Sequence, residues 1–476
     1  EVDLGQHARL VARIAAQVDT VFVPAFVAWP WWDRCGLLEW HAETGTSHML
    51  HRMNQRLVSE LAAVPGVHVL DARGWIDRGR GFDPRSWYAA KMPFDASVYA
   101  HASDELLSAL RAVRGHARKI VVTDLDGTLW GGVVGDDGWK SLKLGGHDPA
   151  GEAFADVQRL LKSLANRGIL LGVVSKNEEA TALHAIENHP EMLLRKDDFV
   201  GWRINWDDKA QNLVALLDEL NLGPEAAVFL DDNPVERQRI RDMLPEVAVP
   251  DLPENALRVP AFLASLNHFN TASVSGDDRN RTAMYRTRRE AEELRDRIGS
   301  IDDWLESLET VVTFEALHER NLERTVQLLN KTNQMNLATR RLTQPELLQW
   351  LDEGERRLFT FRVCDRFGDS GLTGIASIEL SERSGVAQIV DFVLSCRVMG
   401  RKVEETLVHV LVEEARARGA TEVRAELIET AKNQPCLRFW RSSAFDGDGE
   451  SLRFRWDAAR PYPLPGPIRL VAAEPR

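Results

Sequence analysis

The stretch Ile120-Val121-Val122-Thr123-Asp124-Leu125-Asp126-Gly127-Thr128 joins an apolar run to two carboxylates that stand two residues apart. The apolar run is typical of a buried strand. In an open α/β sheet, ligands bind at the carboxyl ends of strands, so we expect Asp124 and Asp126 at a binding edge. There Asp124 is the candidate nucleophile for attack on phosphorus. Asp126 is the candidate acid/base, which first protonates the leaving oxygen and then activates water.

Three further elements with suitable chemistry follow along the chain. Ser175 comes directly after a second apolar run, residues 169–174, and its hydroxyl can hydrogen-bond a phosphoryl group. Lys209 offers a cation that neutralises the phosphate and the nucleophile. Asp231 and Asp232 end a third apolar run and offer the hard oxygen ligands that Mg²⁺ prefers. Turn formation and helix capping are the ordinary alternatives for such aspartates, but they do not account for the whole set. The sequence therefore predicts magnesium-dependent phosphoryl transfer.

Apolar strands alternate with helical stretches between residues 118 and 265, which predicts a parallel sheet covered on both faces. A helix is expected at 154–166, with Gly168 at its end. An amphipathic helix is expected from Val403 to Arg418, with Gly419 as its stop. The pattern divides the chain into five segments. They are 1–117, 118–265, 266–309 (a helical connector), 310–460 and 461–476 (a Pro-rich tail resembling an interdomain linker).

Composition limits the class of protein. With 476 residues, of which 44% are hydrophobic and 28% charged, the chain is too long for one core and typical of globular protein. A net charge of −13 argues against nonspecific binding to nucleic acid or anionic membranes, and no apolar run is long enough for a membrane span. The four cysteines form no C-x-x-C pair, so we expect no disulfides, no structural zinc and a reduced cytoplasmic setting. A start at Glu1 instead of methionine suggests an excised segment.

The strand-end residues resemble the motifs of the haloacid dehalogenase (HAD) superfamily. The resemblance implies Mg²⁺ held between Asp124, the carbonyl of Asp126 and the pair Asp231-Asp232, and it implies an acid/base at Asp126. Only residues 130–138 and one helix lie between the first two motifs. That length fits a small flap, so the site is expected to be open to a large partner or closed by another domain.

A longer set of motifs resembles the FkbH-like branch of that superfamily. The matching stretches are residues 124–135, Val174-Ser175-Lys176-Asn177, Phe229-Leu230-Asp231-Asp232-Asn233-Pro234, residues 331–336 and residues 394–401. Members of this branch divert 1,3-bisphosphoglycerate into polyketide assembly: they form a glyceryl thioester, remove the phosphate and load glyceryl onto an acyl carrier protein. One departure is Gly127, where the branch has Asn, and we expect it to change loop flexibility more than chemistry.

The C-terminal part resembles acyltransferases of the GNAT fold. The motifs are Arg397-Val398-Met399-Gly400-Arg401-Lys402, before the amphipathic helix, and Asn433-Gln434-Pro435-Cys436-Leu437-Arg438-Phe439-Trp440. The resemblance implies that Arg397, Gly400, Arg401 and Asn433 bind the phosphate of a pantetheine arm, with free backbone N–H groups at the helix start. Lys402 departs from the Gly or Ala of that loop, so a pyrophosphate is a poor fit. The alternative is a GNAT-like domain that binds no ligand.

An acyl phosphate needs a nucleophile and cations. Cys396, between a strand and Arg397, is the candidate thiolate, since Arg397 and Arg401 favour ionisation. A buried, structural cysteine is the alternative. Cys364 is the rival thiol, and Cys35 and Cys436 are weaker. Five basic residues are candidates for binding phosphate: Lys176, Arg203, Lys331, Arg340 and Arg341. A second set either docks an acidic carrier or forms a solvated helix face, and it consists of Arg279, Arg281, Arg286, Arg288, Arg289 and Arg295.

The N-terminal segment carries the stretch Trp87-Tyr88-Ala89-Ala90-Lys91-Met92-Pro93-Phe94, which resembles the end of the SGNH-hydrolase-like domain that precedes some FkbH-like domains. The part that carries the serine nucleophile of such domains is missing. Residues 1–117 are therefore expected to be partial and non-catalytic. The predicted fold class is α/β: a HAD Rossmann-like parallel sheet core, preceded by a partial SGNH-like α/β domain and followed by a GNAT-like α+β domain.

Three functions stay open on the sequence. The first is a glyceryl transferase/phosphatase that takes 1,3-bisphosphoglycerate, forms a thioester at Cys396, dephosphorylates it at Asp124 and loads an acyl carrier protein. The second is a plain magnesium-dependent phosphatase with a structural GNAT-like domain. The third is a non-catalytic carrier-docking module of a megasynthase. Neither the acyl group nor the order of dephosphorylation and transfer follows from the sequence.

Overall fold

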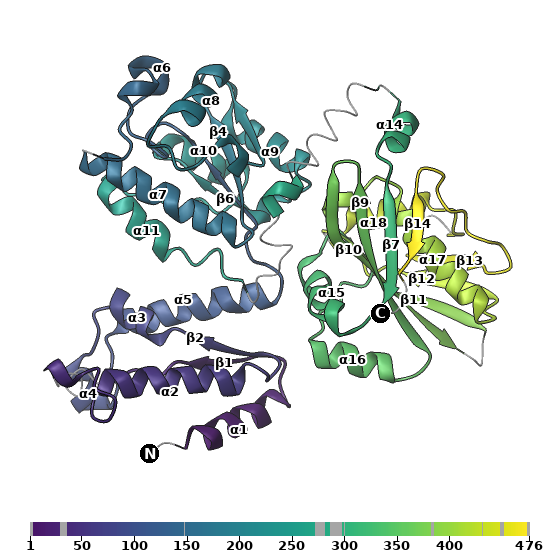
Figure 1. Cartoon of the computed structure of the whole chain (residues 1–476), viewed down its shortest axis with the longest axis horizontal. Helices are drawn as coiled ribbons and strands as arrows, with labels where there is room; N and C mark the ends of the chain where they lie inside the picture. Colours follow the sequence, from purple (N-terminus) through teal and green to yellow (C-terminus); the bar gives the residue numbers. More distant parts are fainter. Residues whose placement is uncertain are drawn as a thin grey trace. The chain divides into compact units, whose positions relative to one another are not determined.

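The computed structural model describes residues 3–28, 36–146, 148–271, 281–285, 298, 300–381, 385–430, 432–447 and 452–473 (Figure 1). The chain forms two compact units, Glu1–Val113 with Thr343–Leu348, and Arg114–Leu342 with Gln349–Arg476. Over the described ranges, the structure has no helix that is both long and apolar enough to cross a bilayer.

The first unit is a small α/β arrangement. Its two strands, β1 (Val21–Pro24) and β2 (Val67–Leu70), pair in parallel. Its helices are α1 (Leu4–Ala15), α2 (Thr46–Leu61), α3 (Ala72–Arg78), α4 (Pro84–Ala90) and α5 (Ala96–Val113). A core of Ala8, Val11, Val23, Leu57 and Leu61 joins α1 and α2 to the strands. A sheet of two strands fits the prediction of a partial α/β domain. The Trp29-Pro30-Trp31-Trp32 stretch and Cys35 lie outside the described residues.

The second unit begins with a four-stranded parallel sheet in the order β5-β4-β3-β6. Its strands are β3 (Ile120–Thr123), β4 (Leu170–Ser175), β5 (Gly201–Ile204) and β6 (Ala227–Leu230). Alternate residues face opposite sides: Val121 and Val228 pack in one cluster, whereas Val122 and Phe229 pack in the other. The apolar runs were predicted as buried strands, and β3, β4 and β6 confirm this prediction. The short strand β5 was not predicted, because its residues Trp202 and Arg203 break the apolar run.

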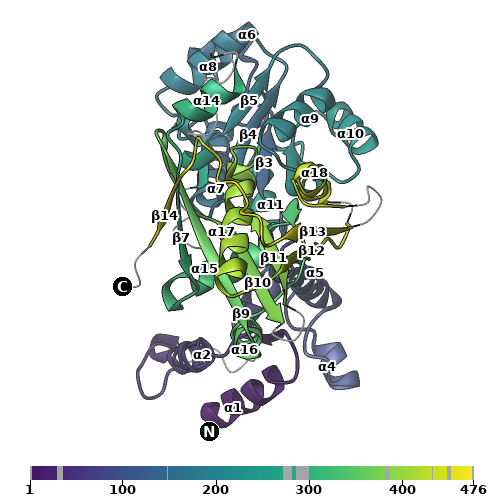
Figure 2. The ribbon, with the colours of Figure 1, turned by 90° about the vertical axis from the view of Figure 1, so that its right-hand side faces the viewer.

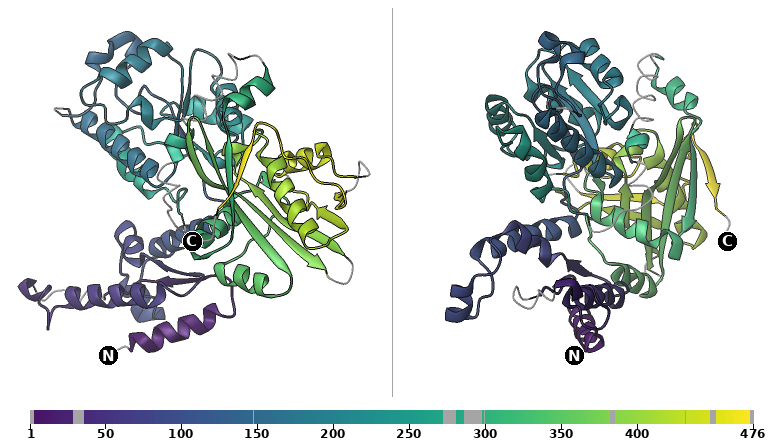
Figure 3. Two further views of the ribbon diagram at one scale, coloured as in Figure 1. Left: turned by 45° about the vertical axis from the view of Figure 1, so that its right-hand side comes forward. Right: turned by 60° about the vertical axis from the view of Figure 1, so that its left-hand side comes forward.

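Helices cover both faces of this sheet, as Figures 1 and 3 show for the blue and teal region. They are α7 (Pro149–Asn166), α8 (Glu179–Asn188), α9 (Lys209–Glu219), α10 (Pro234–Met243) and α11 (Val259–Ser265). The helix predicted at 154–166 starts five residues earlier, because Asp148 accepts a hydrogen bond from the Ala150 N–H as N-cap and Pro149 takes the first helical position. The described residues between β3 and α7 form the single turn α6 (Val134–Asp137) and the 3-10 turn Trp139–Ser141, which fits the predicted small flap.

The larger sheet of the second unit runs β13-β12-β11-β10-β9-β7-β14, with β8 attached to β11. The strands are β7 (Val311–Ala316), β8 (Met335–Asn336), β9 (Arg356–Asp365), β10 (Gly368–Ser381), β11 (Val386–Leu394), β12 (Glu422–Glu426), β13 (Arg453–Asp457) and β14 (Arg469–Ala472). From β7 to β13 the pairs are antiparallel except β11 with β12, which is parallel. The region therefore has the α+β architecture that was predicted.

The helices of this region are α14 (Ile301–Ser307), α15 (Glu319–Lys331), α17 (Val403–Ala417) and α18 (Gln434–Ser442). Helix α16 (Gln344–Asp352) belongs to the first unit as far as Leu348. Helix α17 lies along β10 and β11, which Figure 2 shows in yellow-green over green. Its predicted apolar face is confirmed, because Val403, Leu407, Val410 and Leu411 are all buried in the core. Gly419 follows the helix at a φ of +79°, a value that favours glycine.

The Pro-rich tail, which was expected to resemble an interdomain linker, packs against the core of the second unit. Residues 461–467 form no helix or strand, but Tyr462 is buried and packs its ring against Trp456 at a centroid distance of 5.1 Å. The Tyr462 carbonyl oxygen lies 2.6 Å from His409 Nδ1 on α17. Beyond it, β14 pairs in parallel with β7. Proline excludes regular structure but does not prevent burial, and the aromatic ring ties the tail to the core.

The arginine-rich connector lies largely outside the described residues. Arg279, Arg286, Arg288, Arg289 and Arg295 fall there, so the structure adds nothing on their predicted docking role. Arg281 is described, and its guanidinium donates to the Gly168 carbonyl at 3.0 Å.

Candidate active site

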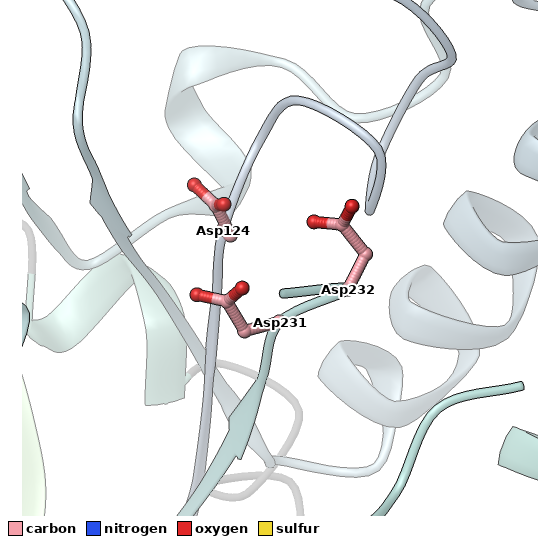
Figure 4. Close-up of side chains that lie close together, drawn as sticks. All are labelled: Asp124, Asp231 and Asp232. Atoms are coloured by element: carbon pink, nitrogen blue, oxygen red, sulfur yellow. The ribbon is translucent and has the colours of Figure 1, made fainter. Parts of the chain in front are cut away.

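Three carboxylates meet at the carboxyl edge of the parallel sheet (Figure 4). Asp124 follows β3, and Asp231 and Asp232 follow the neighbouring strand β6. One carboxylate oxygen from each lies within 4.8 Å of the others. Because adjacent parallel strands end side by side, residues 107 positions apart in the sequence become neighbours here. This edge is the place that the sequence predicted for them.

Lys209 joins two of these carboxylates. It is the first residue of α9, whose N-cap Asp208 accepts from the N–H groups of Ala210 and Gln211 and so fixes where the helix begins. Its Nζ lies 2.7 Å from Asp124 Oδ2 and 2.7 Å from Asp231 Oδ2. Burial alone would lower the pKa of Lys209, but the two carboxylates outweigh burial and the pKa is raised. The lysine is therefore a fixed positive charge at the site.

The cluster fits a divalent cation. Asp124 Oδ1 is buried and has no hydrogen-bond partner among the described residues, while Oδ2 is taken by Lys209. Burial, followed by the like charge of Asp124, raises the pKa of Asp231 to about 6. One lysine does not balance three carboxylates, and an orphaned carboxylate oxygen is costly to bury. Hard oxygen donors at this spacing are ligands that Mg²⁺ prefers.

Asp126 is held by three donors, none of which was among the predicted site residues. Its Oδ1 accepts from Trp130 Nε1 at 2.7 Å and from the Val134 N–H at 3.1 Å, and its Oδ2 accepts from Asn177 Nδ2 at 2.9 Å. Trp130 is buried and Val134 begins α6, so both flap-side donors come from the short segment between the first two motifs. The carboxylate thus has a fixed orientation, as a general acid/base requires.

Ser175 ends β4 and is buried beside the site, where Asn177 Nδ2 also donates to Ser175 Oγ at 3.1 Å. Asn177 could have been found from the sequence, since residues two apart in an extended segment face the same side. The prediction for its neighbour Lys176 stays untested. Lys176 Nζ is on the exposed surface and pairs with Glu236 at 2.7 Å.

Arg203, predicted to bind phosphate, is also occupied elsewhere. Its guanidinium lies 2.5 Å from Glu219 Oε2 at the end of α9, and it donates to the Trp202 carbonyl at 2.9 Å. The structure therefore brings together Asp124, Asp126, Ser175, Lys209, Asp231 and Asp232, and it leaves Lys176 and Arg203 in ion pairs outside this group.

Gly127 is required by the geometry of the loop. Its φ is +69°, and a Cβ at this position would lie 2.4 Å from Asp232 Oδ2. Glycine is free to adopt this conformation and lets the Asp232 carboxylate approach the backbone. A side chain here must therefore displace Asp232, so this position affects the carboxylate cluster as well as loop flexibility.

Cys396 lies after β11, in the 3-10 turn Cys396–Val398. Its Sγ is 3.3 Å from the hydroxyl of Tyr285, which is itself buried. The cysteine lines a pocket of the second unit with Lys119 and several other cations, namely Arg281, Arg324, Lys331 and Arg397. Tyr285 was not predicted, because the sequence gives no signal that places it beside this thiol.

The other described thiols are in surroundings that disfavour the thiolate. Burial raises the pKa of Cys364, and Asp369 beside it adds to the increase. Burial raises the pKa of Cys436 to about 12. A thiol nucleophile reacts as the thiolate, which both environments disfavour.

The predicted pantetheine-binding residues are all buried or tied within the protein. Arg401 pairs with buried Asp365 at 2.7 Å, and Arg397 Nε donates to Ser395 Oγ at 3.1 Å. The Gly400 N–H donates to Glu404 Oε1 at 2.7 Å. Asn433 is fully buried and donates to the Asn336 carbonyl at 3.1 Å. These contacts give each residue a structural role, and ligand binding by them stays a prediction.

The remaining candidate cations are dispersed. Arg340 donates to buried Asp391, with Nε 3.0 Å from Oδ1, and its guanidinium lies 4.5 Å from the centre of the Trp350 ring. Arg341 donates to the Leu329 carbonyl and to Asn333, and burial lowers its pKa. Of the three candidates Lys331, Arg340 and Arg341, only Lys331 lines the Cys396 pocket.

Comparisons with known proteins identify an extended similarity to a solved structure. No model of a known protein family matches the sequence, and no curated protein matches it. The crystal structure of the N-terminal part of the protein BF1531 from Bacteroides fragilis, described as containing a phosphatase domain complexed with Mg, is 30% identical. The match covers 57% of this chain and 74% of that chain, with a TM-score of 0.51.

Acetyltransferase structures match a shorter part of the chain. The spermidine/spermine N-acetyltransferase SpeG from Vibrio cholerae is 14% identical, covering 31% of this chain and 94% of its own, with a TM-score of 0.24. An N-acetyltransferase from Staphylococcus aureus Mu50 is 13% identical, covering 31% and 98%, with a TM-score of 0.25.

Proposed function

The chain belongs to the same family as the phosphatase-containing N-terminal part of BF1531. From this premise we propose that its parallel-sheet region is a magnesium-dependent phosphatase of the HAD type, coupled to acyl transfer through the GNAT-like region. The observation that carries the proposal is the cluster of Asp124, Asp231 and Asp232 closed by Lys209. Among the described residues its buried Asp124 Oδ1 has no hydrogen-bond partner, so this oxygen is available either to a metal ion or to a phosphorus atom.

The residues of the site divide the work of phosphate removal. Asp124 attacks phosphorus and forms an aspartyl phosphate, while the bond to the leaving oxygen breaks. Asp126, oriented by Trp130 and Asn177, gives that oxygen its proton and then takes one from the water that hydrolyses the aspartyl phosphate. Lys209 offsets the negative charge throughout.

Magnesium would be held by Asp124, Asp231 and Asp232, and it would neutralise the charge that develops on the phosphoryl oxygens. Ser175, buried at the end of β4, is within the same edge and supplies a hydroxyl for the transferring phosphoryl group.

For the acyl half we propose the FkbH-like reaction on 1,3-bisphosphoglycerate. The Cys396 thiolate attacks C1, a C–S bond forms, and the C1–O bond breaks with inorganic phosphate as the leaving group. Phosphate removal at Asp124 converts the phosphoglyceryl unit to glyceryl. The thiolate of an acyl carrier protein then attacks the thioester and Cys396 leaves as thiolate. The cations around Cys396 suit a phosphorylated substrate, and Tyr285 donates to or accepts from the thiol.

Intact-protein mass spectrometry tests this function. Enzyme, Mg²⁺, 1,3-bisphosphoglycerate and a carrier protein are incubated, and we expect the carrier to gain one glyceryl group. Cys396→Ser should abolish loading but retain hydrolysis of a simple phosphate monoester. Cys364→Ser, which removes another thiol of the second unit, is the matched control and should load normally.

One result would reject the acyl-transfer half, and another would reject only the assignment of Cys396. An unloaded carrier with folded, active enzyme would leave a plain phosphatase with a structural GNAT-like region. Undiminished loading by Cys396→Ser would place the thioester on a different residue.

A further inference from the structure

The parallel pair in the GNAT-like sheet is short. Strands β11 and β12 pair only from Val386↔Glu422 to Ile389↔Ala425, although β11 continues to Leu394. Beyond that point the two strands no longer supply hydrogen bonds to each other. Backbone N–H and C=O groups that face such an opening need other partners, and an extended segment is a natural one. The opening is thus a slot for a strand-like ligand or for the chain itself.

The chain fills this slot with residues 335–337. Strand β8 pairs antiparallel with β11, Met335 opposite Leu394 and Asn336 opposite Val393. The next residue bridges the opening, since the Leu337 N–H donates to the Phe392 carbonyl at 3.1 Å, and the Leu337 carbonyl accepts from the Ile428 N–H at 2.9 Å. Met335, Asn336 and Leu337 are at most 2% exposed. We call residues 335–337 the inserted strand.

A buried amide fixes the inserted strand. Asn433 is 0% exposed, and its Nδ2 donates to the Asn336 carbonyl at 3.1 Å and to the Ile428 carbonyl at 2.8 Å. Its Oδ1 accepts from the Thr430 N–H at 2.8 Å. Both donor hydrogens of the amide are therefore used in holding the slot closed, and a ligand in the slot would leave buried polar groups unpaired.

A carboxylate occupies the loop that precedes α17. The Gly400 N–H donates to Glu404 Oε1 at 2.7 Å. Glu404 is 5% exposed, and its Oε2 is buried with no hydrogen-bond partner among the residues described. A phosphate dianion at this helix start would meet this carboxyl group in place of a free donor. Lys402, in a left-handed conformation with φ +64°, directs its ammonium to Glu405 at 2.9 Å.

We propose that the inserted strand and Glu404 keep a phosphopantetheine arm out of this slot, whether coenzyme A or a carrier protein brings it. This inference rests on the proposed function for its consequence: the carrier arm, which is chemically the same as that of coenzyme A, must reach the Cys396 thioester from outside the slot. The Cys396 sulfur first attacks the carbonyl carbon of the acyl phosphate, so that a C–S bond forms and inorganic phosphate leaves. The incoming carrier thiolate then forms its C–S bond as the Cys396 C–S bond breaks.

Calorimetric titration of the full chain with coenzyme A tests the exclusion. We expect no binding with a Kd below about 1 mM. Binding tighter than this by the wild-type protein would overturn the inference. It would leave the phosphatase proposal standing, because the titration contains no phosphorylated substrate and does not measure phosphatase activity. Conversely, absent carrier loading together with absent coenzyme A binding would overturn the proposed function but not this exclusion.

Hydrogen exchange tests the mechanism of exclusion. In the wild-type protein the amides of Leu337 and Ile428 should be protected, and coenzyme A should not change their exchange. Asn433→Ala should speed exchange at Leu337 by about tenfold or more, while Asn255→Ala, an exposed helix cap elsewhere, should not. Exchange at Leu337 that is fast in the wild type, or that rises on adding coenzyme A, would show a displaceable segment and overturn the proposal.

Discussion

Two regions of the second unit carry polar groups of the kind found in phosphate-binding sites: the carboxyl edge of the parallel sheet and the start of α17. In the first region a carboxylate oxygen has no partner among the residues that the structure describes, whereas in the second the donors are bonded to other groups of the protein. At the carboxyl edge of the parallel sheet, three carboxylates share one lysine, and Asp124 Oδ1 has no partner among the described residues. At the start of α17, the Gly400 N–H is bonded to Glu404, and Asn433 and Leu337 close the neighbouring slot. The first region is left with charge to be satisfied by a ligand.

The contrast teaches that a motif predicts hydrogen-bond donors and acceptors, but not whether other groups of the protein already bond to them. Donor and acceptor groups bind a ligand only when the fold leaves them unsatisfied. The following variants break or sharpen this contrast, and they are ordered from the largest expected effect to the smallest.

Asp124→Asn should lower the rate of phosphate release on the order of 10³-fold or more, because the nucleophile is lost. Phosphate release under saturating Mg²⁺ is the measurement. Asp156→Asn, a surface carboxylate paired with Arg159 on α7, is the control and should retain full activity. Unchanged product formation by Asp124→Asn would instead favour a non-catalytic carrier-docking module.

Lys209→Met should lower the free energy of unfolding by about 3–5 kcal/mol in the absence of metal, since two buried carboxylates lose their cation. Mg²⁺ should stabilise this variant more than the wild type, because a cation then takes over the role of the lysine. Urea unfolding with and without Mg²⁺ measures both effects. Lys176→Met, which breaks an exposed ion pair, should change stability by less than about 1 kcal/mol.

Glu404→Gln should stabilise the protein in a pH-dependent way. Burial raises the pKa of Glu404 from 4.5 to about 7. The folded protein therefore holds this proton more tightly than the unfolded chain, so the wild type loses stability as pH rises from 4.5 to 7 and levels off above. Glutamine cannot ionise and still accepts from the Gly400 N–H.

The gain of Glu404→Gln over the wild type should grow across this pH window to at most about 3 kcal/mol. Urea unfolding at pH 5 and pH 8 reports it. Glu405→Gln, on the same turn but paired with Lys402, should show no such growth. An equal gain at both pH values would mean that Glu404 is ionised as an ordinary surface carboxylate.

Asn177→Ala should reduce kcat by about tenfold with little change in KM, because it removes one donor that orients Asp126. Steady-state phosphatase kinetics measure this split. Asn188→Ala, at the exposed end of α8, should behave as the wild type. A rise in KM alone would assign Asn177 to substrate binding instead of to positioning the acid/base.

The sequence predicted most of the phosphatase-like site, because its signals are local. Apolar runs mark β3, β4 and β6, and each run is followed directly by the side chains that the sheet edge gathers: Asp124, Ser175 and Asp231. Parallel pairing of neighbouring strands then places these ends together without further information. Amphipathic periodicity likewise predicted the buried face of α17.

Tertiary structure alone decided which polar and aromatic groups are paired with other groups of the protein. The bond from Asn433 to Asn336 joins residues 97 apart, and that from Tyr285 to Cys396 joins residues 111 apart. The burial of Tyr462 in a Pro-rich tail is of the same kind. Such contacts depend on packing between segments that no local pattern relates, whereas strand ends and helix faces follow from residues next to one another. The sequence by itself therefore indicated which chemical groups lie at the two regions, whereas the fold determined whether those groups are available to a ligand.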